Sequence, residues 1–329
     1  MKTLYPWQEN LWQHLRAYRI QERIPQALLV TGMAGIGKRD LVEAFARTLL
    51  CRAPLADHTT CGHCQGCTLQ AAHTHPDFML IEPDEPGKAI GIDKIRQLII
   101  RLALKPQFET YRVVVISPAE QLNNASANAF LKCLEEPTER TCLILLTEKP
   151  ARLPATIRSR CQTLHCPLPE PAIALQWLQQ QGVREQAELV LNLAQGAPLL
   201  ARHQARENWL PLRQTYFETW LKIAEGKANL VAVAEAWQKS DALDLAVVLR
   251  WMLNWVADIV KIAHAGDEKT LHNPDLKKSL QALAERLELQ RIYPFYDNLL
   301  LAQAQLHTQI NKQLMLEQLL IAWSQLSKR

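Results

Sequence analysis

In the first half of the chain, short continuous apolar runs alternate with longer stretches in which apolar residues recur every three or four positions. The runs cover residues 27–30, 78–81, 111–116 and 142–147. Uninterrupted aliphatic runs of this length are typical of strands buried on both faces of a sheet. The periodic stretches cover residues 7–23, 38–50, 92–104, 122–136 and 154–161. This alternation predicts an α/β fold with a doubly wound parallel sheet.

In the second half, the pattern indicates helices alone. Three closely spaced prolines at 167, 169 and 171 mark a boundary, and short helices are expected at 172–181 and 185–194. From about residue 209 to the end the apolar spacing is helical. Two sets of positions illustrate it: Leu245, Val248, Leu249 and Met252, and Leu316, Leu319, Leu320 and Trp323. Trp251, Trp255 and Trp323 fall within these faces, so we expect core packing and not a platform for stacking bases.

A glycine-rich segment lies between the first predicted strand and the next helix, and it reads Gly32-Met33-Ala34-Gly35-Ile36-Gly37-Lys38-Arg39. Through Lys38 it matches the P-loop pattern G-x-x-x-x-G-K-[ST] in the strand–loop–helix context that the pattern requires. Gly32, Gly35 and Gly37 would let backbone N–H groups surround a phosphate at the positive end of a helix. Arg39 replaces the hydroxyl that ligates Mg²⁺, and a guanidinium cannot ligate a cation. We therefore expect no turnover of Mg·ATP, and weak nucleotide binding stays open.

The strand at 111–116 supports the same expectation. In a working P-loop ATPase it would end in the acidic residues that support Mg²⁺ and polarise water. Here it ends in Ser117-Pro118, and Glu120 comes three residues late. We interpret Glu120 as a solvated or capping carboxylate; a catalytic role is the alternative.

Four of the eight cysteines have the spacing of a metal site. Cys61, Cys64 and Cys67 form two overlapping C-x-x-C steps, and Cys51 precedes them by ten residues. This spacing predicts a tetrahedral Zn²⁺ site, and four sulfur ligands leave no open position for catalysis. Disulfides or free thiols are the alternatives. Nearby histidines at 58, 63, 73 and 75 are expected to be surface residues of the module.

Composition and net charge exclude few classes of function. The chain has 329 residues, which is long for one hydrophobic core, and a net charge of +4, which does not demand nucleic acid. No apolar run approaches the ~20 residues that span a bilayer, and the N-terminus lacks a signal-peptide pattern, so the expected location is cytoplasmic.

Taken together, the motifs resemble the AAA+ clamp-loader subunits of bacterial DNA polymerase III. The resemblance covers about the first 165 residues and rests on the glycine loop, the four-cysteine insertion and two further motifs. These are Ala129-Phe130-Leu131-Lys132-Cys133-Leu134-Glu135-Glu136-Pro137 and Ser159-Arg160-Cys161. It implies three domains: a P-loop-like AAA+ domain at 1–166 with its zinc module at 51–67, a helical lid at 167–206 and an all-α oligomerisation collar at 207–329.

The resemblance also implies partners and roles. Such subunits form a hetero-pentameric ring with gamma or tau motors and delta, and the ring places a sliding clamp on primed DNA as part of a DNA-directed DNA polymerase. Arg160, with Ser159 and Cys161 as its motif, would be an arginine finger for a neighbour's ATP; a plain surface arginine is the alternative. Thr147 takes the place of the first sensor. The second sensor arginine is absent, because residues 197–200 read Ala-Pro-Leu-Leu.

Losses at Arg39, Ser117-Pro118 and Leu199 lead us to expect a stationary, non-hydrolysing subunit. One alternative is an ATP-hydrolysing motor of the gamma/tau type. Another is a zinc-dependent nucleic-acid binder, which the sequence disfavours because Arg52 is the only Lys or Arg between Cys51 and Cys67.

Overall fold

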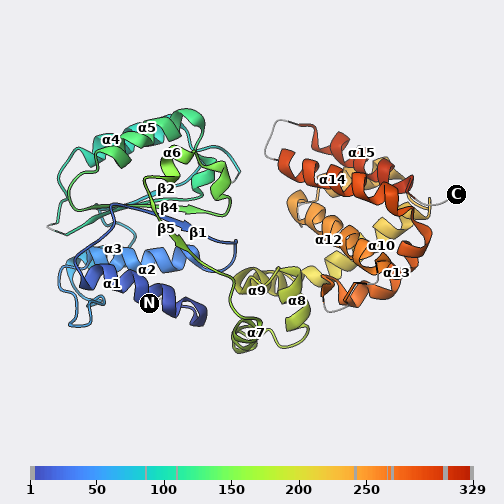
Figure 1. Cartoon of the computed structure of the whole chain (residues 1–329), viewed down its shortest axis with the longest axis horizontal. Helices are drawn as coiled ribbons and strands as arrows, with labels where there is room; N and C mark the ends of the chain where they lie inside the picture. Colours follow the sequence, from blue (N-terminus) through green and yellow to red (C-terminus); the bar gives the residue numbers. More distant parts are fainter. Residues whose placement is uncertain are drawn as a thin grey trace. The chain divides into compact units, whose positions relative to one another are not determined.

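The first part of the chain is built on one parallel sheet with the strand order β2-β3-β4-β1-β5 (Figure 1). The structure is a computed structural model that describes residues 4–85, 87–108, 110–240, 243–264, 266–267, 270–306 and 310–326. The strands are β1 (Ala27–Thr31), β2 (Phe78–Ile81), β3 (Arg112–Ile116), β4 (Thr141–Thr147) and β5 (Gln162–His165). The expected parallel sheet is confirmed, and β1, β3 and β4 are buried along their whole length.

Alternate residues of the central strands feed two separate cores. Leu28 and Val30 of β1 pack on the side of α1 (Glu9–Ile20) and α2 (Lys38–Leu50), whereas Leu29 packs on the opposite side. That opposite side is covered by α4 (Ile92–Leu102), α5 (Asn124–Glu135) and α6 (Ala155–Arg158) (Figure 1). Because successive side chains of a strand point to opposite faces, a continuous apolar run serves both cores.

Two elements of this part are absent from the sequence prediction. The strand β5 lies at the sheet edge, beside β1, and only Leu164 of its residues is buried. The helix α3 (Gln65–Ala71) begins inside the cysteine module. Cys64 is its N-cap residue, and the Cys64 sulfur accepts a hydrogen bond from the N–H of Cys67. Neither element has enough apolar residues to produce a periodic signal.

The rest of the chain is helical, as predicted. Its helices are α7 (Pro171–Gln180), α8 (Ala187–Leu193), α9 (Pro198–Arg206), α10 (Trp209–Ala224), α11 (Leu230–Gln238), α12 (Leu245–Ala263), α13 (Lys277–Arg286), α14 (Leu289–Gln305) and α15 (Lys312–Ser324). The two predicted apolar sets of α12 and α15 are buried, as are Trp251, Trp255 and Trp323. The rings of Trp220 and Trp323 stack with centroids 3.7 Å apart, so these tryptophans are core residues, as expected.

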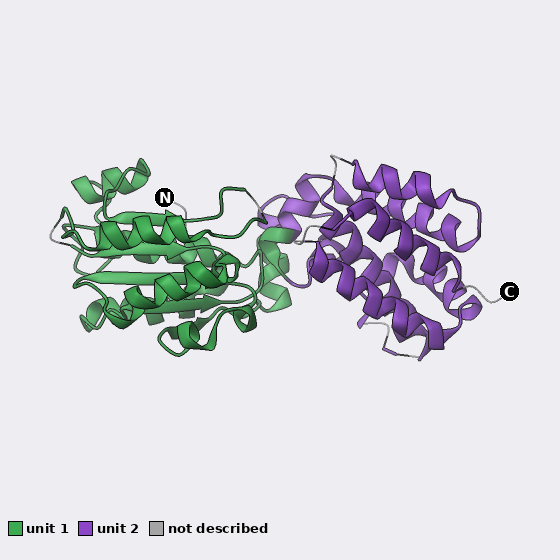
Figure 2. Cartoon of the chain, turned by 90° about the horizontal axis from the view of Figure 1, so that it is seen from above, with its two compact units in different colours: residues 1–177, 197–200 green, residues 178–196, 201–329 purple. Residues whose placement is uncertain are grey.

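The chain divides into two compact units, drawn in Figure 2: residues 1–177 with 197–200, and residues 178–196 with 201–329. The division into three domains at 166 and 206 stays a prediction. In the part of the chain that the structure describes, no helix combines the length and the apolar character needed to cross a membrane.

Candidate functional site

The glycine loop connects β1 to α2, as predicted, and places Lys38 as the first residue of α2. Gly35 and Gly37 have φ values of 74° and 84°, which glycine adopts without the steric cost of a Cβ. The Lys38 ammonium donates to the carbonyl oxygen of Met33 at 2.6 Å, so the side chain bonds its own loop. Burial lowers the pKa of Lys38, although Glu148 and Glu120 act in the opposite direction.

Side chains from the start of the chain cover the outside of this loop. The Gln8 amide donates to the carbonyl oxygens of Ile36 and Gly37, at 3.2 and 2.7 Å, and the Trp7 indole donates to Ile36 at 2.9 Å. A Cβ on Gly37 would lie 2.5 Å from the Tyr5 ring. No local sequence pattern predicts these contacts, because they join segments far apart along the chain.

The inner side of the loop lines a cavity of about 250 Å³. Its lining comprises Ala34, Gly35, Gly37, Lys38, Arg39, Asp40, Ser117, Pro118, Leu146, Thr147, Glu148 and Leu199. The backbone N–H of Leu199 donates to the carbonyl oxygen of Gly35 at 2.9 Å, and a Cβ on Gly35 would lie 2.7 Å from that of Leu200. The segment where a second sensor was expected therefore packs on the loop with apolar side chains. The cavity is smaller than the roughly 300–1,000 Å³ of most small-molecule sites.

Arg39 turns toward carboxylates. Its Nε lies 3.0 Å from Oε1 of Glu43, one turn along α2, and its Nη1 lies 2.7 Å from Oε1 of Glu82, which follows β2. The position that holds a Mg²⁺-ligating hydroxyl in a working P-loop thus carries a cation in two ion pairs.

At the end of the neighbouring strands, Thr147 and Glu120 contact backbone groups. The buried Thr147 hydroxyl accepts from the N–H of Lys149 at 3.1 Å, and a carboxylate oxygen of Glu120 accepts from the N–H of Glu148 at 3.2 Å. No carboxylate directly follows β3, which is continued by Ser117 and Pro118. The contact of Glu120 agrees with its interpretation as a capping carboxylate.

Arg160 lies at the surface, just beyond α6. Its Nη1 donates to the carbonyl oxygen of Thr156 at 3.0 Å, and its Nη2 lies 2.9 Å from Oε1 of Glu135, the last residue of α5. The two side chains keep 38% and 49% of their exposure. Ser159 donates to the same Thr156 carbonyl at 3.1 Å, while burial raises the pKa of the Cys161 thiol to about 11. The pairing with Glu135 was not predicted, and it joins two of the motifs identified in the sequence.

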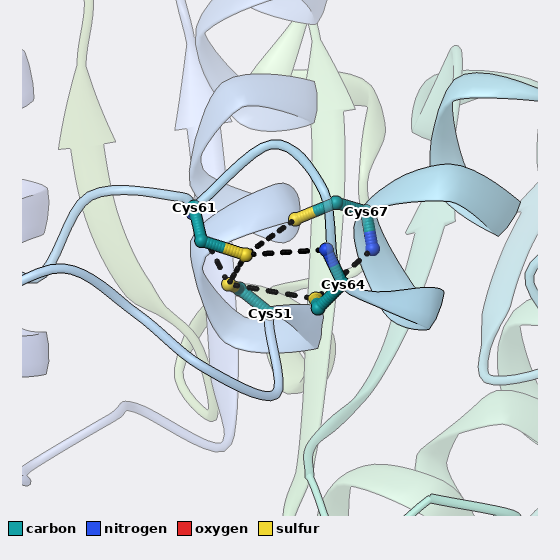
Figure 3. Close-up of side chains that lie close together, drawn as sticks. All are labelled: Cys51, Cys61, Cys64 and Cys67. Carbon is teal, nitrogen blue, oxygen red and sulfur yellow. Dashed lines mark hydrogen bonds between the residues drawn. The ribbon is translucent and has the colours of Figure 1, made fainter.

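The four cysteines meet as predicted, with all four sulfurs within 4.8 Å of one another (Figure 3). Cys51 Sγ lies 3.6 Å from that of Cys61 and 3.9 Å from that of Cys64, and Cys61 Sγ lies 3.9 Å from that of Cys67. A tetrahedral site with Zn–S bonds of about 2.3 Å requires S···S separations of about 3.8 Å, whereas a disulfide requires about 2.05 Å. The arrangement therefore fits a four-thiolate metal site and not disulfides.

Backbone donors surround these sulfurs. The N–H groups of Cys61, Cys64 and Cys67 each point to the sulfur of another cysteine at 3.4 Å. Burial raises the pKa of the Cys51 and Cys67 thiols, whereas at Cys64 hydrogen bonds from backbone N–H groups outweigh burial and bring the pKa down to about 6. Such donors stabilise the thiolate, which is the form that binds a metal.

One expectation about the histidines is wrong. His63 and His73 are exposed, but His75 is buried, and burial lowers its pKa. Its Nδ1 accepts from the N–H of Asp77 at 3.1 Å, and its ring lies beside Phe108. It was misjudged because tertiary contacts, such as the one with Phe108, are not revealed by any local pattern.

A parallel sheet with a P-loop-like segment after β1, followed by helical regions, defines a P-loop α/β protein, the architecture that the AAA+ clamp-loader resemblance implies. Two family models match the chain: DNA polymerase III, delta subunit, over residues 7–169, and its C-terminal counterpart over residues 207–325. The chain is 36% identical to the DNA polymerase III subunit delta′ of Pseudomonas aeruginosa over 331 residues, or 99% of each chain. It is 32% identical to the Escherichia coli subunit delta′, over 96% of this chain and 94% of that one. The chain belongs to the family of DNA polymerase III delta′ subunits.

One solved structure to which the chain was matched is the gamma subunit-related protein of Thermotoga maritima. It is 17% identical, with a TM-score of 0.42, over 96% of this chain and 99% of that one.

Proposed function

We propose that the chain is the stationary, non-hydrolysing subunit of a clamp loader, and that it supplies Arg160 to ATP held by a neighbouring subunit. Its partners would be gamma or tau motors, delta, the sliding clamp and, through the assembled ring, primed DNA. One observation carries the proposal. The Arg160 guanidinium is exposed at the surface and, among the described residues, is not part of the lining of the chain's own loop cavity.

Several features of the loop support the absence of hydrolysis. Arg39 is held by Glu43 and Glu82, and Lys38 bonds the Met33 carbonyl where a phosphate would need its charge. The lining offers no hydroxyl at position 39 and no carboxylate directly after β3. These residues do not fit a magnesium nucleotide, so we assign no catalytic step to this loop.

The surroundings of Arg160 support its role toward a nucleotide. Residues 149–169 contain four cations, at Lys149, Arg152, Arg158 and Arg160, and no Asp or Glu. All four are exposed. An arginine is always protonated and has a planar fork of donors that matches phosphate oxygens, so it can neutralise charge that develops on a transferred phosphoryl group.

The helical unit would hold the ring together. Exposed apolar side chains recur at a spacing of seven on two adjacent helices: Tyr293 and Leu300 on α14, and Leu314 and Ile321 on α15. Residues seven apart lie on the same side of a helix, so each pair forms a stripe suited to helix–helix association. We assign residues 207–329 to a collar domain on this basis and on the family resemblance, and residues 167–206 to a lid on the resemblance alone.

For the cysteine cluster we propose a structural Zn²⁺. Four thiolates at tetrahedral spacing close the coordination sphere, and a closed site organises its module without chemistry of its own. Cys51 follows α2 directly, so the ion would fix the far end of the helix that starts at the loop.

Two measurements test the proposal. The isolated chain should hydrolyse no ATP beyond the level of Lys38→Ala; turnover on the order of 1 s⁻¹ that this substitution abolishes would instead support a motor of the gamma/tau type. In the assembly with motor and delta subunits, Arg160→Ala should assemble normally and lower the DNA-stimulated ATPase. Unchanged turnover would contradict the arginine-finger role.

A further inference from the structure

The guanidinium of Arg160 already has an anionic partner within its own chain. Oε1 of Glu135 lies 2.9 Å from Nη2, so one edge of the fork is occupied by a carboxylate. A second contact, from Nη1 to the Thr156 carbonyl, is independent of Glu135. The neighbouring Glu136 is also exposed but forms no ion pair within the described part of the chain.

We propose that Glu135 is a displaceable counter-ion that occupies Arg160 in the free subunit and gives way to the phosphate of a neighbour's nucleotide. This inference rests on the proposed role of Arg160. Carboxylate and phosphate oxygens bind the same N–H fork of an arginine, so the two anions compete for Nη2. Glu135 would therefore act as a positioning residue that sets how readily Arg160 engages the neighbour's nucleotide.

The geometry suits exchange. Both side chains are partly exposed, and exposed ion pairs are weak enough to open readily. When the carboxylate leaves, the contact of Nη1 with Thr156 still orients the guanidinium. A phosphate carries more negative charge than a carboxylate and offers several acceptor oxygens, so it displaces Glu135 once a neighbouring nucleotide is in reach.

The competition has a predictable cost. If Arg160 is free in only a fraction of the molecules, its apparent affinity for the neighbour's nucleotide equals the intrinsic affinity multiplied by that fraction. Glu135→Gln keeps the size of the side chain and removes its charge. It should increase engagement by about two- to five-fold, the range expected for an exposed pair. Turnover at saturation should not change, because the engaged arginine is the same.

The first experiment uses the isolated full-length chain. Phenylglyoxal modifies arginines through their neutral form, which a paired carboxylate disfavours, and mass spectrometry reads the rate at each site. Arg158 is an internal reference, because it is exposed and forms no ion pair among the residues described. In Glu135→Gln the ratio of Arg160 to Arg158 modification should rise about two- to five-fold. In the matched control Glu136→Gln it should stay unchanged, and equal ratios in the two variants would overturn the proposal.

The second experiment uses the complex assembled with motor and delta subunits. DNA-stimulated ATPase is titrated against the concentration of this chain for Glu135→Gln and Glu136→Gln. Glu135→Gln should lower the half-saturating concentration by about two- to five-fold at unchanged maximal turnover. The difference should vanish in an Arg160→Ala background. A lower maximal turnover in Glu135→Gln would instead mean that the carboxylate holds the arginine in its working position, and would refute displacement.

The two proposals fail separately. If Arg160→Ala leaves the ATPase of the complex intact, the proposed function fails, whatever the modification rates. If Arg160→Ala lowers the ATPase but Glu135→Gln behaves like Glu136→Gln, the finger stands and the counter-ion role is refuted.

Discussion

Arg213 is a buried charge in the helical unit, and its removal should destabilise that unit strongly. The side chain is 2% exposed and lies on α10. Its Nη1 and Nη2 hold both oxygens of Asp275, at 2.9 and 2.8 Å, and its Nε and Nη2 donate to the Asn273 amide oxygen. Asn273 in turn donates to the buried Asp258. This network fixes the segment before α13 against α10 and α12.

The expected loss in the free energy of unfolding follows from the contacts that each partner of Arg213 loses. Removing one member of a fully buried ion pair costs about 3–5 kcal/mol. The Asp275 side chain keeps 34% of its exposure, so water recovers part of that loss. The Asn273 oxygen is fully buried and would be left without a donor, at about 1–3 kcal/mol. We therefore expect Arg213→Met, which retains much of the apolar stem, to cost about 2–4 kcal/mol.

Tryptophan fluorescence during urea unfolding measures this cost. Six of the nine tryptophans, at 209, 220, 237, 251, 255 and 323, lie in the helical unit, so the signal reports mainly on it. With an m-value of about 2 kcal/mol/M, the midpoint should fall by roughly 1–2 M. Lys222→Met is the matched control, because it removes an exposed cation from the same helix. If Arg213→Met shifts the midpoint no more than Lys222→Met, the network does not stabilise the unit as reasoned.

Three further predictions concern the cysteine module. Cys61→Ser should reduce the metal bound per chain from about one to near zero, because the substitution removes one thiolate from a four-sulfur site. Atomic emission measures the bound metal, and full retention would contradict the assignment. Gly66→Ala should lower metal retention under a chelator, because its Cβ would lie 2.4 Å from a backbone carbonyl, whereas Gly91→Ala, which meets nothing within 4 Å, should not. Below pH 6.5 the wild type should lose stability relative to His75→Asn. Burial lowers the pKa of His75 in the folded state, so the unfolded chain takes up the proton first as the pH falls. Hydrogen exchange of backbone amides in the sheet measures this difference. Parallel pH profiles would rule this out.

Much of the fold could be predicted because its signals are local. The buried strands β1, β3 and β4 are continuous apolar runs, and α2 begins and ends at the residues predicted for it. The cysteine cluster was predictable because all four cysteines lie in one short segment. The edge strand β5 was missed, since a strand with one buried residue has almost no hydrophobic signal.

The contacts of the candidate site could not be predicted, because they join segments distant in sequence. Trp7 and Gln8 donate hydrogen bonds to the glycine loop, and Arg160 pairs with Glu135. Both sets of contacts depend on how the helices pack around the sheet. The burial of His75 has the same origin. In each case the residue type was compatible with a surface position, and only the tertiary structure determines whether the side chain is buried or paired.

The proposed role of Arg160 is to act on a neighbour's nucleotide. It is tested most directly by single-turnover ATP hydrolysis in the assembled complex on primed DNA, with Arg160→Ala and Arg160→Lys compared with Arg158→Ala. Arginine fingers accelerate phosphoryl transfer by on the order of 10³-fold or more, and a lysine lacks the fork that does so. Both Arg160 variants should assemble but lose hydrolysis at one site, while Arg158→Ala should keep it. Hydrolysis at every site in a fully assembled Arg160→Ala complex would contradict it.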